Sequence, residues 1–351
     1  MDRRQVTWGL AAAAATAAVG PFGLSRARAA VSADLVAAAE KEGKVVWYTT
    51  MIVNQAVRPI ADAFMKKYPK IKVEFTRAGS GDTALKIINE HQAGRMMGDV
   101  FDGTATFSSI MPAGAVQTYK AAESSAYPDE LKDPDGYWTA LNLYFLTAAY
   151  NTNLVKPDQV PKSYDDLLNP KWKGQMVWST VPEPVAAPGF LGNMLLLKGD
   201  KGGMEYIDKL AAQKVTNMSS SQRTVLDRVI VGDFPLGLMV FNHHVDISKA
   251  KGAPIEWLHM EPLVSAASLV GLIKDGPNPN AGKLLIEYML SEEGQKVLAS
   301  TSYLPAHPKV PATIPTLLPT GPKPFKYTMM SPKIVDANLK TWIKLLNEKF
   351  G

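Results

Sequence analysis

The sequence contains no cysteine among its 351 residues. This absence excludes disulfides, a thiolate nucleophile, and zinc or iron–sulfur sites built on cysteine. A large excess of one charge is also missing. The first 30 residues hold four arginines against one acidic residue, and without them the 38 basic and 33 acidic side chains become 34 and 32. With so small a surplus, and no stripe of Lys or Arg interleaved with aromatics, we expect no nucleic-acid partner.

The remaining composition is that of a folded protein. Hydrophobic residues make up 46% and charged residues 20% of the chain, which argues against a disordered polypeptide. The length is about twice that of a common domain, so two lobes are expected. After residue 30 there is no internal repeat, no low-complexity segment and no apolar run long enough to span a membrane.

Residues 1–30 have the layout of a secretory signal peptide. The basic pair Arg3-Arg4 precedes an Ala-rich apolar stretch from Trp8 to Leu24, and small residues stand where a signal peptidase cleaves, at Ala27-Arg28-Ala29. The arginine pair resembles a twin-arginine export signal, and an ordinary Sec signal is the alternative. Without a cysteine, a lipoprotein anchor is excluded. We therefore expect the mature protein in a bacterial periplasm.

Helices and strands alternate over the first part of the mature chain, which predicts a parallel sheet with helices on both faces. The β-branched and aromatic run at 44–50 is typical of a buried strand, and the apolar residues of 54–68 recur at helical spacing. The expected elements are a helix at 34–42, a strand at 44–50, a helix at 54–68, a strand at 72–76, a turn at 79–82, a helix at 83–93 and a strand at 99–102.

The middle of the chain predicts a second α/β lobe inserted into the first. The two crossings between lobes are expected near residues 140–150 and 260–270. The expected elements are a strand at 140–150, a helix at 161–174 between prolines, a strand at 175–179, helices at 190–197 and 203–213, a helix to about 231 begun by 219–223, a strand at 235–241, a strand at 267–273, and helices at 280–298 and 332–350.

No pattern typical of an enzyme occurs. The sequence has no Gly-x-Ser-x-Gly, no His-Glu-x-x-His and no P-loop. The acidic pairs Asp165-Asp166 and Glu292-Glu293 fall on expected helices, where adjacent side chains do not face each other. We therefore expect a protein that is not an enzyme.

Several loops offer groups that suit an anion. Ligands of open α/β sheets lie outside the carboxyl ends of the strands, and helix N-termini there present free N–H groups. For each residue alone, ordinary turn chemistry is the alternative. The candidate ligand-binding residues of these loops are Thr49, Thr50, Gly79, Ser80 and Thr104 in the first lobe and Ser220, Ser221, His243 and His244 in the second.

Arginine is scarce after residue 30, where it occurs only at positions 58, 77, 95, 223 and 228. A guanidinium grips a carboxylate or phosphonate with two parallel hydrogen bonds, which an ammonium cannot do. Arg77 and Arg223 stand beside candidate loops, one in each lobe, and are therefore expected ligand contacts. Surface ion pairing is the alternative for both.

Six short segments, in order, carry a family resemblance. They are Gly43-Lys-Val-Val-Trp-Tyr-Thr-Thr50, Thr76-Arg-Ala-Gly-Ser-Gly81, Gly98-Asp-Val-Phe-Asp-Gly103, Ala149-Tyr-Asn-Thr-Asn153, Ser163-Tyr-Asp-Asp-Leu-Leu-Asn-Pro-Lys-Trp-Lys-Gly174 and Ser291-Glu-Glu-Gly-Gln295. Through them residues 34–300 resemble the periplasmic solute-binding proteins of bacterial ABC importers. The group in question contains the ferric-iron-binding proteins and their phosphonate-, thiamine- and sugar-phosphate-binding relatives.

The resemblance implies a fold and partners. The fold would be the α/β, two-lobed type II periplasmic binding protein with hinge strands, in which residues 31–142 and 265–351 form lobe 1 and residues 143–264 form lobe 2. The partners would be a small-molecule ligand and the membrane permease of the importer. We expect a monomer, and no cofactor is implied.

Iron is the sharpest question that the resemblance raises. Ferric-binding relatives hold the metal with a tyrosine pair after Asn-His, whereas this sequence reads Asn242-His243-His244-Val245, and residues 143–147 lack the arginine of several iron binders. Adjacent residues on a strand point to opposite faces, so a joint chelate by the two histidines is not expected, while one histidine could donate a hydrogen bond to a ligand. Oxygen donors remain at Tyr48, Tyr144 and Tyr150. We therefore predict no metal and a small anionic organic ligand, with a ferric ion or metal chelate as the alternative.

Overall fold

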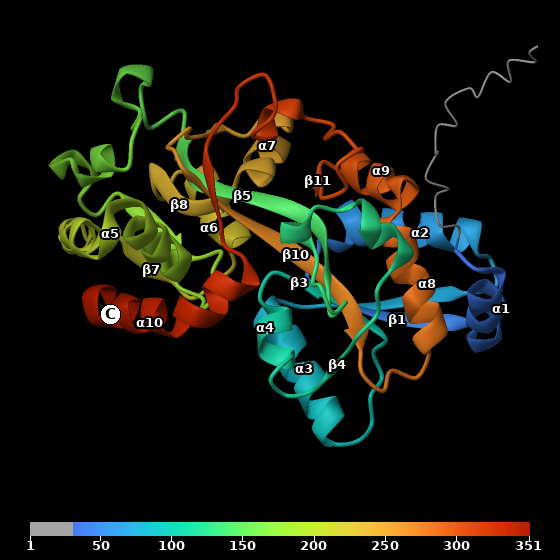
Figure 1. Ribbon diagram of the computed structural model, residues 1–351. Coiled ribbons are helices and arrows are strands. Elements are labelled where there is room, and N and C mark those ends of the chain that lie inside the picture. Colours follow the sequence, from blue (N-terminus) through green and yellow to red (C-terminus); the bar gives the residue numbers. More distant parts are fainter. Residues whose placement is uncertain (1–30) are drawn as a thin grey trace, which may run out of the picture. The chain divides into compact units, whose positions relative to one another are not determined.

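The computed structural model describes residues 31–351, which form one compact unit (Figure 1). The predicted signal peptide, residues 1–30, lies outside the described residues, so cleavage and export route stay predictions. In the part of the chain that is described, no helix combines the length and the apolar character needed to cross a bilayer.

One mixed sheet organises the molecule, with the strand order β2-β1-β3-β10-β5-β8-β6-β7. Its two outer parts are parallel, as the alternation of helices and strands predicts: β1 pairs with β2 and β3, and β6 pairs with β7 and β8. The strands are β1 (Lys44–Thr49), β2 (Lys72–Arg77), β3 (Val100–Gly103), β5 (Thr139–Asn151), β6 (Met176–Ser179), β7 (Thr216–Met218), β8 (Leu236–Phe241) and β10 (Leu263–Ile273).

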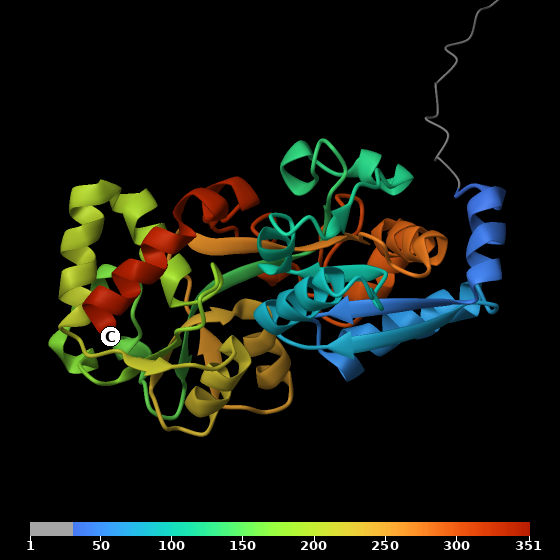
Figure 2. The same cartoon turned by 90° about the horizontal axis from the view of Figure 1, so that it is seen from below.

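The two parallel parts meet at the long antiparallel strands β5 and β10, which run between them in Figures 1 and 2. Strand β10 pairs antiparallel with β3, and β5 pairs antiparallel with β8. The sequence predicts crossings between lobes near 140–150 and 260–270, which are the regions where these two strands lie. Shorter strands add to them: β4 (Val116–Gln117) and β12 (Tyr327–Met329) pair with β10, and β9 (Ile255–Trp257) and β11 (Leu304–Pro305) pair with β5.

Helices cover the sheet and bury large side chains such as Trp47, Trp178 and Phe64. Helix α1 packs on α8, and α2 packs on α9. The helices are α1 (Ala33–Glu42), α2 (Arg58–Lys67), α3 (Ser80–Gln92), α4 (Thr106–Ile110), α5 (Ala187–Ala211), α6 (Gln222–Ile230), α7 (Asn242–Ala250), α8 (Pro279–Leu290), α9 (Glu292–Ser300) and α10 (Pro332–Phe350).

Three sequence predictions about helices are wrong, each for a local reason. The predicted helix at 161–174 is two 3₁₀ turns, Asp165–Leu168 and Pro170–Trp172, because Pro170 lacks an N–H and disfavours a helical residue before it. The predicted turn at 79–82 already belongs to α3, which begins at Ser80. The predicted helix at 280–298 breaks at Ser291, whose side chain caps α9.

The C-terminal helix α10 is where the sequence predicts it, but it packs on α5 of the second lobe. Both views show the two helices side by side (Figures 1 and 2). Gly192 makes room for the contact, since a Cβ there would lie 2.4 Å from the Trp342 ring. The assignment of residues 31–142 and 265–351 to lobe 1 and of 143–264 to lobe 2 stays a prediction, and this contact links α10 to the part of the chain predicted to be lobe 2.

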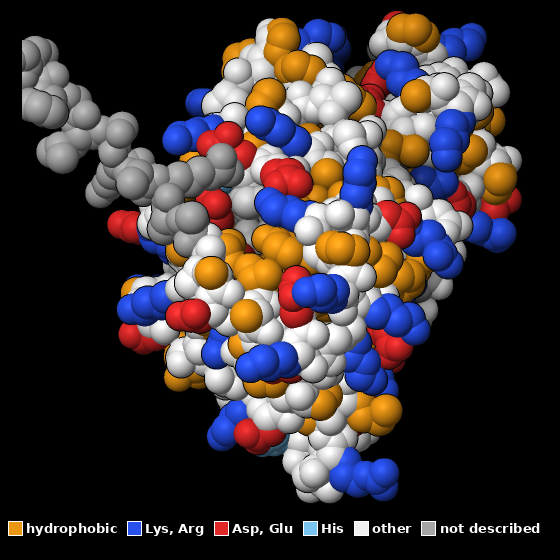
Figure 3. Space-filling model, turned by 90° about the vertical axis from the view of Figure 1, so that its right-hand side faces the viewer, with side chains coloured by type: hydrophobic (Ala, Val, Ile, Leu, Met, Phe, Trp, Pro, Cys, Tyr) orange, Lys and Arg blue, Asp and Glu red, His pale blue; other side chains and the backbone are white. Residues whose placement is uncertain are grey.

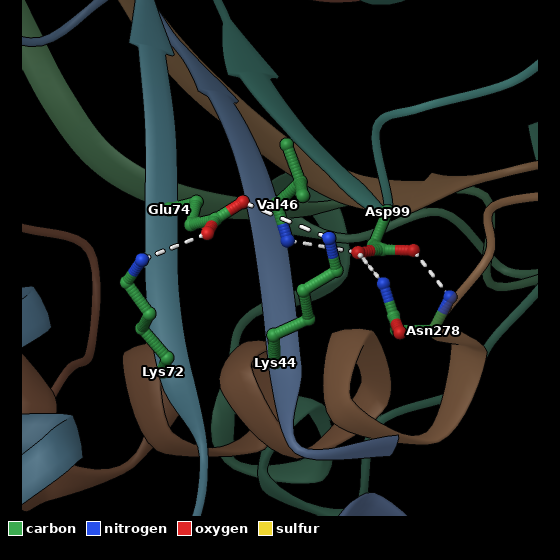
Figure 4. A network of polar contacts seen from close by, with 6 residues as sticks. All are labelled: Lys44, Val46, Lys72, Glu74, Asp99 and Asn278. Atoms are coloured by element: carbon green, nitrogen blue, oxygen red, sulfur yellow. Dashed lines mark hydrogen bonds and ion pairs between the residues drawn. The ribbon is translucent and has the colours of Figure 1, made fainter.

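A buried and an exposed set of polar contacts lie close together around β1 (Figure 4). Asp99 is fully buried just before β3, and its carboxylate accepts from Val46 N at 2.8 Å, Asn278 N at 2.6 Å and Asn278 Nδ2 at 3.0 Å. It thereby joins β1 to the segment that begins α8. Glu74 instead forms exposed ion pairs with Lys72 at 2.9 Å and Lys44 at 3.8 Å.

Exposed charge is mixed on the face in Figure 3, where Lys and Arg side chains alternate with Asp and Glu. The ion pairs between Lys70 and Glu40 (2.7 Å) and between Lys67 and Glu293 (2.5 Å) are of this exposed kind. The even distribution agrees with the small charge surplus of the sequence.

Candidate functional site

The predicted loop after β1 is held by a buried carboxylate. Asp102, which is 0% exposed, accepts from Trp47 Nε1 at 2.8 Å, Thr50 N at 3.1 Å and Thr50 Oγ1 at 2.9 Å. Burial raises the pKa of Asp102, and the hydrogen bonds from Thr49, Thr50 and Trp47 act in the opposite direction. The hydroxyl of Thr49 also accepts from Met51 N at 3.2 Å. Both threonine hydroxyls thus form hydrogen bonds that hold the loop after β1.

The loop after β2 becomes the N-terminus of α3. Gly79 is the N-cap and provides no side-chain cap, and Ser80 is buried. The carboxyl of Glu183, from the segment that precedes α5, lies here: burial and the charge of Asp82 raise its pKa, and the backbone N–H of Gly81 lowers it. A carboxylate of the chain itself therefore already faces this helix N-terminus.

The predicted residues at α6 are engaged in local contacts. Ser221 caps the helix by accepting from Thr224 N, and the carbonyl of Ser220 accepts from Ser179 Oγ at 2.6 Å. Arg223 pairs with Asp227 at 2.6 Å and donates from Nη1 to Ser248 Oγ at 3.0 Å. Ser248 Oγ in turn donates to the carbonyl of His244 at 2.9 Å, so α6 and α7 are tied together beside the two histidines.

His243 and His244 lie in the first turn of α7, not in a loop after a strand. The argument that adjacent strand residues diverge therefore fails: the two ring centroids are 4.3 Å apart. The side chains are 0% and 7% exposed, and none of their four ring nitrogens has a hydrogen-bond partner among the described residues. Phe241 is the N-cap residue of α7 and its side chain accepts no hydrogen bond from the helix. The first backbone N–H groups of α7 therefore have no side-chain acceptor at the N-cap.

Aromatic rings surround the pair. The His243 ring lies 5.6 Å from Tyr144, stacked at 25°, and 5.1 Å from Tyr303, and the His244 ring lies 5.3 Å from Phe241. Tyr144 belongs to β5, whereas Tyr303 follows α9 and accepts at its hydroxyl from Ile52 N at 3.2 Å. The contacts therefore join α7 to β5 and to the segment that follows α9.

The antiparallel strands add further unpartnered polar atoms. Asn142 and Tyr144 are two residues apart on β5, and Ser268 of β10 is paired with Asn142, so these side chains share one face of the sheet. Asn142 Oδ1 and Ser268 Oγ are buried and form no hydrogen bond of normal geometry within residues 31–351, although both side chains lie near enough to Tyr144 to lower its pKa against the larger effect of burial. We call Asn142, Tyr144, His243, His244, Ser268 and Tyr303 the junction cluster.

Electrostatics keep the junction cluster neutral. Burial lowers the pKa of His244 to about 3, with the positive charges of Arg223 and Arg77 adding to the effect. Burial and the neighbouring His244 lower the pKa of His243 well below its ordinary value. Burial raises the pKa of Tyr303 to about 12 and that of Tyr144 well above its ordinary value. Arg77 at the end of β2 and Arg223 on α6 thus act on one histidine from both lobes.

The structure brings some sequence-predicted residues together and leaves others apart. His243 and His244 lie in the junction cluster, and Arg223 is linked to the His244 carbonyl through Ser248. Arg77 is exposed, and its positive charge lowers the pKa of His244. Thr104 instead lines a small cavity with Ser108, Trp138 and the start of α10.

The three tyrosines proposed as oxygen donors separate in the same way. The Tyr48 hydroxyl is engaged by Glu90 at 2.9 Å, and Tyr150 lines a groove with Lys249, Glu256 and Trp257. Only Tyr144 lies beside the histidines.

Asn142, Ser268 and Tyr303 were missed by the sequence analysis. Asn142 and Ser268 sit inside apolar runs that read as buried strands, and Tyr303 follows a helix more than 50 residues from α7. A polar residue within an otherwise apolar strand was the available signal for the first two. Among residues 31–351, no group of three or more His, Asp or Glu side chains is arranged to hold a metal ion.

Comparisons with known proteins agree with this architecture. The periplasmic binding protein AfuA from Actinobacillus pleuropneumoniae, solved with fructose-6-phosphate, superposes with a TM-score of 0.73 and 22% identity, over 88% of this chain and 98% of that one. An Fe(3+)-binding periplasmic protein of Serratia marcescens is 22% identical, over 81% of this chain and 84% of its own length. A putative 2-aminoethylphosphonate-binding periplasmic protein of Salmonella typhimurium is 25% identical, over 69% and 71%.

The fold is therefore the two-lobed type II periplasmic binding protein fold, as the sequence analysis expected. Bacterial extracellular solute-binding proteins bind small ligands, work with the permeases of ABC importers and are not enzymes. The model of the bacterial extracellular solute-binding protein family matches residues 98–323, which is more than half of the chain. The chain belongs to the bacterial extracellular solute-binding protein family.

Proposed function

We propose that this protein is the periplasmic receptor of an ABC importer for a small anionic organic solute, and that the solute's anionic group binds at the junction cluster. The observation that carries the proposal is the pair His243 and His244, buried with four unpartnered ring nitrogens at an uncapped helix N-terminus. Buried polar groups are nearly always hydrogen-bonded, so a cluster without partners among the described residues calls for a further partner, which we take to be the ligand.

The charges around the pair favour an anion. Arg77 and Arg223 supply positive charge from two lobes, and the N-terminus of α7 adds unsatisfied N–H groups and the positive end of the helix dipole. The N-terminus of α3 is the weaker alternative, because Glu183 already lies against it. Relatives named for phosphonate and sugar-phosphate ligands support an anionic solute.

The first experiment is native mass spectrometry of protein purified without refolding, followed by binding measurements with the solute it identifies. Arg77→Ala should weaken binding by about 1.5–3 kcal/mol and leave the melting temperature of the unliganded protein almost unchanged. Arg95→Ala, in an exposed segment after α3, is the matched control and should change neither quantity. A co-purified cation, or Arg77→Ala with unaltered affinity, contradicts the proposal.

A ferric ion or metal chelate is the second candidate, because Tyr144 and Tyr303 flank His243 and relatives include an Fe(3+)-binding protein. Iron binding by tyrosine needs phenolates, and the raised pKa values of both tyrosines disfavour them. We therefore expect a colourless protein. Iron titration with visible spectroscopy and metal counting tests this, and one tightly held Fe³⁺ per chain would favour the second candidate.

We further infer that the mature protein starts after residue 30 and is a monomer in the periplasm whose lobes close on the solute about β5 and β10. Two lobes joined by hinge strands bury a ligand by hinge motion. Small-angle scattering with and without the identified solute should show compaction. An unchanged radius of gyration at saturation would contradict closure.

A further inference from the structure

We propose that His243 and His244 take up a proton when the anionic ligand binds, so that the receptor binds its solute and a proton together. The inference rests on the function proposed above and adds to it a dependence of affinity on pH. It starts from geometry: two imidazoles whose ring centroids are 4.3 Å apart, both fully or almost fully buried, with no partner for any ring nitrogen among the described residues.

The charged and titratable groups around the pair come from four elements and from the segment after α9. Arg77 of β2 and Arg223 of α6 act on His244. Tyr144 of β5 and Tyr303 lie beside His243. Asp102, at the end of β3, acts on both tyrosines.

Two carboxylates lie beside these groups: Asp102, which already accepts from Trp47 and Thr50, and Asp227, which pairs with Arg223 at 2.6 Å. Two arginines therefore oppose a third positive charge on the histidines while the ligand is absent.

An anion changes this balance. A negative group held at the N-terminus of α7 neutralises the field of Arg77 and Arg223 and attracts a proton to the nearest imidazole. A neutral imidazole has one donor and one acceptor, whereas imidazolium has two donors, and a fully charged anion is best served by donors only. Protonation would thus convert the unpartnered ring acceptors into donors toward the ligand, with the proton coming from solvent.

The experiment uses sulfate, which keeps its charge from pH 5 to 8. Titration calorimetry at pH 5.5 in two buffers of different ionisation enthalpy counts the protons taken up per sulfate, and we expect close to one. For one linked proton, the dissociation constant should fall about tenfold per pH unit between pH 7 and pH 5. Near-ultraviolet circular dichroism at each pH verifies that the protein is folded.

Variants assign the proton. The double variant His243→Gln, His244→Asn retains amide donors near the ring-nitrogen positions but cannot titrate, so sulfate affinity should become independent of pH. His91→Gln, near the end of α3, is the control and should retain the wild-type dependence.

The outcomes separate the two proposals. Sulfate binding without proton uptake, and with affinity constant within twofold from pH 7.5 to 5, overturns this inference and leaves the anion receptor standing. No sulfate binding at any pH overturns both. Proton release on adding Zn²⁺, without sulfate binding, also overturns both, because metals displace protons from their ligands.

Discussion

Two buried polar regions lie on neighbouring strands, Asp102 on β3 and Ser268 on β10, and they differ in how many of their polar atoms are hydrogen-bonded. The carboxylate of Asp102 accepts three hydrogen bonds, one from Trp47 and two from Thr50. In the junction cluster, His243, His244, Asn142 and Ser268 all retain buried atoms without partners. A satisfied network stabilises a loop, whereas an unsatisfied one costs stability until something binds. We attribute this difference at the junction cluster to a ligand that supplies the missing partners.

The largest effect should come from breaking the satisfied region. Asp102→Ala leaves the Trp47 and Thr50 donors unpaired, each at about 1–3 kcal/mol, so unfolding free energy should fall by about 3 kcal/mol or more. Asp102→Asn retains the size and one carbonyl oxygen and should lose clearly less. Denaturant unfolding measures both variants. A loss below 1 kcal/mol for Asp102→Ala would show that the network is not what stabilises the loop after β1.

A pH dependence of the unliganded protein should be of comparable size. The pKa of His244 is lowered to about 3 and that of His243 also lies well below 6.5, so the unfolded chain binds more protons than the folded one as pH falls. Stability should be fully present above pH 6.5 and decrease below it, by about 1.4 kcal/mol per pH unit for each histidine.

Thermal unfolding of the wild type and of the double variant His243→Gln, His244→Asn between pH 7.5 and 4.5 provides the measurement. The variant should lose most of this slope, and a wild-type slope that the variant retains would point to other groups.

A smaller change should move stability and binding in opposite directions. Ser268→Ala removes an unpartnered buried hydroxyl, so stability should stay constant or rise by up to about 1 kcal/mol, while affinity for the solute falls by about 1 kcal/mol. Ser265→Ala is the control: its hydroxyl is also buried and unpartnered, but it lies three residues away on β10 and so on the opposite face. Weaker binding in Ser265→Ala would argue against the assignment of the face.

The smallest effect should come from exposed charge. Glu74→Gln removes the ion pairs with Lys72 and Lys44 and should cost less than about 0.5 kcal/mol, because water screens both. Chemical denaturation in low and high salt checks this. A loss comparable with that of Asp102→Ala would contradict the distinction between buried and exposed networks.

The sequence predicted the fold well where local pattern and burial agree. The apolar run at 44–50, the alternation of strands and helices up to residue 102 and the two crossings are visible without a structure, because each depends on residues close in the chain. The start of α7 was missed. Asn242-His243-His244 follows a strong strand, and no capping side chain precedes it.

The candidate site was only half predictable. Arg77, Arg223 and the histidines could be chosen by residue type and by position after strands. Tyr303 enters the cluster only because α9 returns the chain to β5 through β11, and the position of Ser268 opposite Asn142 depends on strand register. Register and long-range return are properties of the whole sheet, so no window of sequence contains them.

The packing of α10 on α5 has a consequence for how the chain acquires its structure. Trp342 meets Gly192 across about 150 residues of sequence, and β10 must be present before β3 and β5 can be joined. Contacts between residues so distant in sequence make folding slow, because the chain loses the entropy of closing a long loop before the contact stabilises it. A nascent chain that ends before residue 263 lacks the strand that joins β3 to β5 within the one sheet, and a chain that ends before residue 332 leaves the α5 surface uncovered. The last residues to leave the ribosome, 332–350, therefore complete the part of the protein that contains α5, which is synthesised well before them.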